Sequence, residues 1–118
     1  MFAGKKKLAA LPLVWVVVSA QFLQWGLEFI GEIHPTSSSQ HRWILTATDY
    51  FTKWVEAIPV RNAIDSVVIK FIEENILSRF GCPLQIVTDN ATTFNSIKMI
   101  EFYQKYKIML HHSTSYYP

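Results

Sequence analysis

The sequence predicts an α/β domain with a mixed sheet, in which three antiparallel strands are followed by strands linked through helices. Two observations carry this prediction. Apolar residues alternate with a period of two up to about residue 58, and they then recur every three or four residues. Half of the 118 residues are hydrophobic, which suffices for one small core and excludes a disordered tail.

Three strands are expected in succession over the first half of the domain. The first covers 25–33, where apolar side chains at a period of two define one face: Trp25, Leu27, Phe29 and Ile33. A polar turn at 34–40 leads into a second strand at 42–48. A tight connection then leads into a third strand at 53–58, which Pro59 is expected to stop. Short connections of this kind favour an antiparallel meander.

A helix is expected next, because apolar side chains become spaced by four: Val68, Ile72, Ile76 and Phe80. Either Asn62 or Asp65 is expected to cap its start, and Gly81 followed by Pro83 is expected to end it.

A strand at 84–88, a second helix at 96–105 and a last strand at 107–112 complete the order β-β-β-α-β-α-β. On the second helix, one side is expected to carry the apolar residues Met99, Ile100 and Tyr103.

Three carboxylates are candidates for chemistry because of where they fall on the strands. Asp89 follows an apolar strand and opens a polar loop, where ligands often bind in open α/β sheets, although a turn-forming role is the alternative. Glu28 interrupts a core-like run, so its charge should be paired, metal-bound or on a solvated edge with Glu32. Asp49 also lies at a strand end, and a turn role is favoured there.

The histidines and the single cysteine do not predict a site. His111 and His112 are adjacent and would face opposite sides of a strand, while His34 and His41 lack partners at zinc-finger spacing. Cys82 has no base near it in the sequence, so a catalytic thiol is not expected. A net charge of +2 is too small for binding driven by bulk charge alone.

The N-terminal residues have features of a secretory signal peptide. Lys5, Lys6 and Lys7 precede an apolar run at 8–18, and cleavage after Ala20 would be compatible with that pattern. The run is too short to span a bilayer as a helix. The alternative is an apolar lead-in to the domain.

Four segments, taken in order, resemble the integrase catalytic core of gypsy-type LTR retrotransposons. They are QWGLEFIG at 24–31, WILTATDYFTKW at 43–54, FGCP at 80–83 and TDN at 88–90. The resemblance implies a partial core domain over 22–118, preceded by a lead-in at 1–21 that looks like the Pro-rich linker of the family.

The resemblance implies an RNase H-like fold and a two-metal polynucleotidyl transferase that trims and joins DNA ends. In the family, three carboxylates hold two Mg²⁺ or Mn²⁺ ions. The first two positions fall on Glu28 and Asp89, which are therefore the implied catalytic residues and metal ligands, whereas Asp49 matches no catalytic position. The resemblance implies DNA as a partner, with weak binding in this chain. A homodimer is a further possible partner, and no small-molecule substrate and no membrane span are expected.

Departures from the family pattern imply an inactive chain. Glu28 stands where the family has Asp, and ångström-scale misplacement of a catalytic group can cost about a hundredfold in rate. Pro118 is reached before the helix that carries the third carboxylate. The family implies a nuclear or cytoplasmic location. The alternatives are a domesticated interaction protein on an RNase H-like scaffold and a small secreted protein cleaved after Ala20.

Overall fold

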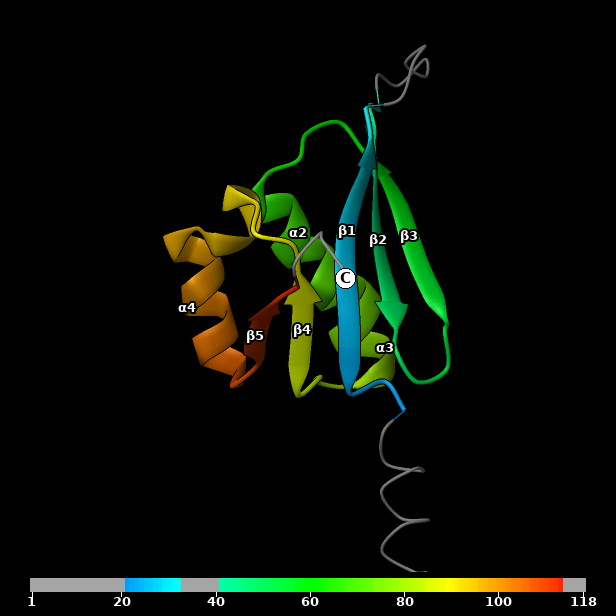
Figure 1. The fold of residues 1–118 in the computed structure, drawn as a ribbon, viewed down its shortest axis with the longest axis vertical. Helices are drawn as coiled ribbons and strands as arrows, with labels where there is room; N and C mark the ends of the chain where they lie inside the picture. Colours follow the sequence, from blue (N-terminus) through cyan, green and yellow to red (C-terminus); the bar gives the residue numbers. More distant parts are fainter. Residues whose placement is uncertain (1–20, 33–40, 114–118) are drawn as a thin grey trace, which may run out of the picture.

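The computed structural model describes residues 21–32 and 41–113, which form one five-stranded mixed sheet with helical segments (Figure 1). Its strands are β1 (Gln24–Gly31), β2 (Trp43–Asp49), β3 (Val55–Val60), β4 (Gln85–Thr88) and β5 (Met109–His112). They lie in the order β3-β2-β1-β4-β5. β1, β2 and β3 form an antiparallel meander, whereas β4 runs parallel to both β1 and β5. The predicted mixed sheet is therefore confirmed.

Two helical segments connect the later strands. The first runs without a break through α2 (Asp65–Phe71), the π-helical η2 (Ile72–Leu77) and α3 (Ser78–Phe80). The second consists of the 3₁₀ turn η3 (Thr92–Asn95) and α4 (Ile97–Tyr106). α2 packs against α4, and Figure 1 shows α2 and α3 behind the sheet. The predicted order of elements is confirmed.

The core lies between the helical segments and one face of the sheet. Strand residues Trp25, Leu27 and Leu45 are buried together with Ile72 and Met99 from the two helical segments. Since both helical segments share this core, they cover the same face. The predicted alternation of the first strand is confirmed for Trp25 and Leu27, whereas the predicted Ile33 and the turn at 34–40 lie outside the described residues.

Pro59 does not stop the third strand, contrary to the prediction. It lies inside β3 and opposes Ile44 of β2. β3 is an edge strand, and an edge strand tolerates proline because only one of its sides must supply hydrogen bonds to a neighbour.

The expected cap of the first helix is also wrong. Ile64 occupies the N-cap position and makes no side-chain capping bond, while Asp65 is the first helical residue. A carboxylate there still interacts favourably with the helix dipole. The prediction for the other end holds, since Gly81 follows Phe80 with a φ of +92°, a conformation that favours glycine.

The buried side of α4 differs slightly from the prediction. Met99 and Tyr103 are buried as expected, but Ile100 is 37% exposed and Phe102 lies in the core instead. Ser96 caps this helix by accepting a hydrogen bond from the Met99 amide at 3.1 Å. Among the described residues, no helix is long and apolar enough to cross a membrane.

Candidate active site

Glu28 and Asp89 lie at the same level of two neighbouring parallel strands. The register pairs Gly26 of β1 with Val87 of β4, and each carboxylate lies two residues further along its own chain. Because side chains alternate along strands, Glu28 lies on the face opposite Trp25 and Leu27. Asp89 directly follows the last residue of β4, at the same end of the sheet. Both residues are exposed.

Glu28 and Glu32 are both exposed, as the interpretation of a solvated edge requires, although the edge is the open side of β1 beyond β4 and not the edge of the sheet. β1 is the central strand, but β4 ends at Thr88 while β1 continues to Gly31. Beyond Gly26, β1 therefore pairs only with β2, where Thr46 opposes Glu28. The Thr46 hydroxyl donates to the backbone carbonyl of Glu28 at 3.3 Å. The Glu28 side chain itself is exposed to solvent.

Asp89 shapes the loop in which it lies. Its Oδ1 accepts a hydrogen bond from the Ala91 amide at 3.0 Å, a short-range turn typical of Asp. The turn-forming alternative is thus confirmed as part of its role. Within the described part of the chain, Oδ2 of Asp89 accepts no hydrogen bond, so one oxygen holds the loop and the other is available to a ligand.

Asp49 lies at the opposite end of the sheet, because the antiparallel register pairs it with Trp25 near the start of β1. It is fully buried. Its Oδ1 accepts from the Phe22 amide at 3.0 Å, and its Oδ2 accepts from the amide and the hydroxyl of Thr52 at 2.7 and 2.6 Å. Asp49 therefore has a structural role at a turn, as predicted, and it is not brought near Glu28 and Asp89.

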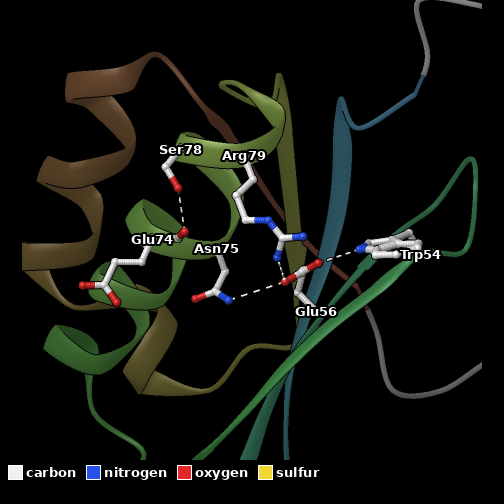
Figure 2. Close-up of polar contacts among 6 residues, drawn as sticks. All are labelled: Trp54, Glu56, Glu74, Asn75, Ser78 and Arg79. Carbon is white, nitrogen blue, oxygen red and sulfur yellow. Dashed lines mark hydrogen bonds and ion pairs between the residues drawn. The ribbon is translucent and has the colours of Figure 1, made fainter.

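A polar cluster centred on Glu56 was not predicted from the sequence. Figure 2 shows the Glu56 carboxylate between Trp54 and Arg79. It accepts from Arg79 at 2.7 Å, from the Trp54 indole at 2.6 Å and from Asn75 at 3.4 Å. These contacts join β3 to η2 and α3. Glu56 lies two residues before Ile58, so both side chains lie on the same face of β3. This alternation was the sequence signal that could have indicated a buried charge.

A hollow of about 250 Å³ lies between the start of α2 and the loop after β4. Its walls combine apolar and polar side chains: Ala63, Ile64, Asp65, Thr92, Thr93 and Ser96. The Thr93 hydroxyl donates to the Ala63 carbonyl at 3.0 Å and so ties the loop to the helix start. The hydroxyl-rich sequence after Asp89 was the only signal of this feature.

The histidines and the cysteine lie apart from Glu28 and Asp89 in their roles in the fold. His111 and His112 are neighbours on β5 and both are exposed, while His34 lies outside the described residues. Partial burial raises the pKa of the Cys82 thiol, which therefore remains protonated at neutral pH. Over residues 21–32 and 41–113, no group of three or more His, Cys, Asp or Glu side chains is placed to hold a metal ion.

The donor set of Glu28 and Asp89 fits one divalent ion. Mg²⁺ prefers oxygen ligands and is often bound by one or two carboxylates, with water and substrate phosphates completing its shell. A second ion would need further ligands, which the described residues do not supply. The two carboxylates thus meet part of the requirement of two-metal chemistry.

Comparison with known proteins points to viral polyproteins. The Gag-Pol polyprotein of avian reticuloendotheliosis virus is 37% identical over 70 residues, which are 59% of this chain and 6% of the relative. The Gag-Pol polyprotein of baboon endogenous virus is 38% identical over 72 residues, covering 61% of this chain and 4% of the relative. The chain therefore spans less than a tenth of the length of either relative.

Solved structures show the same fold. The catalytic core domain of HTLV-2 integrase, solved in complex with magnesium in a trimeric form, superposes with a TM-score of 0.65 at 22% identity. The match covers 76% of this chain and 58% of that one. The dimeric form matches at the same TM-score with 20% identity, covering 78% and 60%. The fold is therefore RNase H-like. Residues 20–118 match the family model of the integrase core domain, and the chain belongs to that family.

Proposed function

We propose that this chain is part of a retroelement integrase core and that it supplies two of the carboxylates that bind divalent metal for DNA strand transfer. A gypsy-type LTR retrotransposon is the source that we infer. The four segments at 24–31, 43–54, 80–83 and 88–90 support this narrower assignment, since each resembles that group.

One observation carries the proposed function. It is the β1–β4 register, from which Glu28 and Asp89 each follow two residues after the paired Gly26 and Val87, together with the exposure of both side chains. Nucleic acid can approach the two carboxylates, because neither is covered by described residues. By contrast, both carboxylate oxygens of Asp49 already accept hydrogen bonds from Phe22 and Thr52.

The residues of the chain have distinct roles in this proposal. Glu28 is carried by the central strand, whose pairing with β2 fixes its backbone. The bond from the Ala91 amide holds one oxygen of Asp89 and leaves the other for the ion. A divalent ion held by these two residues supplies charge stabilisation at a phosphate oxygen of DNA.

Metal binding tests the two site residues directly. Mn²⁺ titration of the full chain, followed by water-proton relaxation, should give an affinity that falls about tenfold or more in Asp89→Asn and in Glu28→Gln. Glu101→Gln is the matched control, because Glu101 is an exposed carboxylate on α4. An equal loss in the control would show that the binding is only diffuse surface charge.

We further propose that these 118 residues alone do not catalyse strand transfer. Two carboxylates match family positions, and the first is Glu rather than the Asp of the family. Among the described residues, no group of three or more His, Cys, Asp or Glu side chains could hold a metal ion. An assay of end processing and strand transfer with Mn²⁺ should show no turnover. Robust turnover that Asp89→Ala abolishes would overturn this part of the proposal while supporting the site.

A further inference from the structure

A row of residues crosses the sheet one step before the level of the proposed metal ligands. The strand registers align Gly26 of β1 with Val87 of β4, and Val87 with His111 of β5 (Figure 1). Residues aligned in this way point to the same face of a sheet, and Glu28 shares that face because it follows Gly26 by two positions. We call it the open face, since the core residues of β1 lie on the other one.

The Tyr50 ring fills the place of the side chain that Gly26 lacks. A Cβ atom at residue 26 would lie 3.1 Å from both the Cε1 atom and the hydroxyl oxygen of Tyr50. The Tyr50 amide donates to the Gln24 carbonyl at 3.0 Å, which fixes the base of this side chain against β1. The Tyr50 hydroxyl therefore lies on the open face above Gly26, and two residues of a strand, about 6.8 Å, separate Gly26 from Glu28.

The charges on the open face suit a negatively charged ligand at this level. Tyr50 is 40% exposed and His111 is also exposed. The Lys53 ammonium lies 6.0 Å from the centre of the Tyr50 ring and adds a positive charge beside it. Among the described residues of the five strands, Glu28 alone is acidic on this face, and a divalent ion bound there would offset its charge.

We propose that Tyr50 and His111 bind the phosphate group next to the one at the metal ion, so that a DNA strand runs along the open face. Tyrosine hydroxyls donate to phosphate oxygens, and a neutral imidazole does so through its one N–H group. β1 and β5 lie about 10 Å apart across β4, a gap that two side chains and one phosphate above Val87 can fill.

The spacing along the strands agrees with this assignment. The step of about 6.8 Å between Gly26 and Glu28 is comparable with the distance between successive phosphates of a nucleic-acid strand. The inference rests on the proposed function, because the ion at Glu28 and Asp89 is what holds the first phosphate. It adds two residues that contact DNA without binding the ion.

DNA binding by the full chain tests the row. A fluorescein-labelled single-stranded DNA of about 12 nucleotides is titrated with protein in Mn²⁺ at neutral pH and followed by fluorescence anisotropy. Tyr50→Phe and His111→Gln should each lower the affinity about fivefold, as for the loss of one hydrogen bond. The matched controls Tyr106→Phe and His112→Gln should bind like the original chain, because Tyr106 lies on α4 and His112 lies on the other face of β5.

Gly26→Val tests the position of the hydroxyl. The added side chain would displace the Tyr50 ring, since its Cβ alone meets the ring at 3.1 Å. Affinity for DNA should fall about threefold in the original background and should not fall in the Tyr50→Phe background, where the hydroxyl is already absent. Equal losses in the two backgrounds would overturn the inference.

Mn²⁺ titration of the same samples, followed by water-proton relaxation, separates this inference from the proposed function. Tyr50→Phe and His111→Gln should keep the Mn²⁺ affinity of the original chain, because neither residue is a proposed ligand. Unchanged DNA affinity in both variants, or equal losses in the two controls, would overturn the inference and leave the metal site intact. If no sample binds Mn²⁺ while the two variants alone lose DNA affinity, the row stands and the metal proposal fails.

Discussion

The two ends of the sheet carry carboxylates in opposite environments. At the hairpin end, Asp49 is fully buried and accepts three hydrogen bonds from Phe22 and Thr52. At the other end, Glu28 and Asp89 are exposed, and the described residues donate only one hydrogen bond to the two carboxylate groups. A strand-end position is common to Asp49 and Asp89, so position alone does not separate structure from function. The number of hydrogen bonds that the protein donates to each carboxylate does separate them. A carboxylate whose two oxygens already accept hydrogen bonds from the protein has no oxygen left for a ligand.

The largest effect should come from Asp49→Ala. Removing the buried Asp49 carboxylate leaves the Phe22 and Thr52 amides without acceptors at a partly buried turn, which should lower the free energy of unfolding by about 3 kcal/mol. Urea denaturation measures this change. A loss below about 0.5 kcal/mol would break the comparison, since Asp49 would then be no more structural than a surface carboxylate.

Glu56→Ala should have the next largest effect. Glu56 is buried, but its partner Arg79 is half exposed and can be hydrated when the ion pair is lost. We expect the free energy of unfolding to fall by about 2 kcal/mol, less than for Asp49, because the Arg79 and Trp54 side chains that donate to Glu56 are half exposed and can bind water instead. Arg79→Ala is the companion variant, and urea denaturation of both should show that the carboxylate is the more costly partner to remove.

Tyr103→Phe extends the comparison to a buried neutral group. The Tyr103 hydroxyl donates to the Phe94 carbonyl at 3.3 Å. Loss of this hydrogen bond should lower the free energy of unfolding by about 1 kcal/mol near pH 7. Burial raises the pKa of Tyr103, so the folded state holds the proton more tightly than the unfolded state. Stability should therefore fall as pH rises above about 10, the ordinary tyrosine value. Urea denaturation from pH 8 to 11 should show a shallower fall in the variant.

The smallest effect on stability should come from Glu28→Gln and Asp89→Asn. Both side chains are exposed, so each change should alter the free energy of unfolding by less than about 0.5 kcal/mol in the absence of metal. Mn²⁺ should raise the thermal midpoint of the original chain but not of these variants, because a ligand stabilises only the state that binds it. A large loss without metal would mean that these carboxylates are structural as well.

Local patterns predicted most of the fold. The period-two run of Trp25 and Leu27, the four-residue spacing from Val68 onward and the Gly81 stop all indicate elements that the structure contains. These signals are reliable because they arise from the geometry of one element against one apolar face. Asp89 at the end of a strand was predicted for the same reason.

The errors share a different cause. Pro59 is tolerated because β3 is at the edge of the sheet, and strand order is not a local property. Phe102 is buried in place of Ile100 because α2 and the sheet together decide which side of α4 is covered. Glu56 is buried because Arg79, 23 residues away, offers it a partner. In each case a residue distant in the sequence decided the outcome.

The sequence by itself determined the order of elements, the apolar face of each and the resemblance of Glu28 and Asp89 to metal ligands, because these depend on short-range spacing and residue type. The tertiary structure decided which carboxylates lie at the same end of the sheet. Parallel pairing of β1 with β4 brings together two residues that are 61 positions apart in the chain, while antiparallel pairing of β1 with β2 sends Asp49 to the far end and buries it. Strand pairing is a long-range choice made by the whole core, and it separates the residue that holds the fold from those proposed to hold the metal.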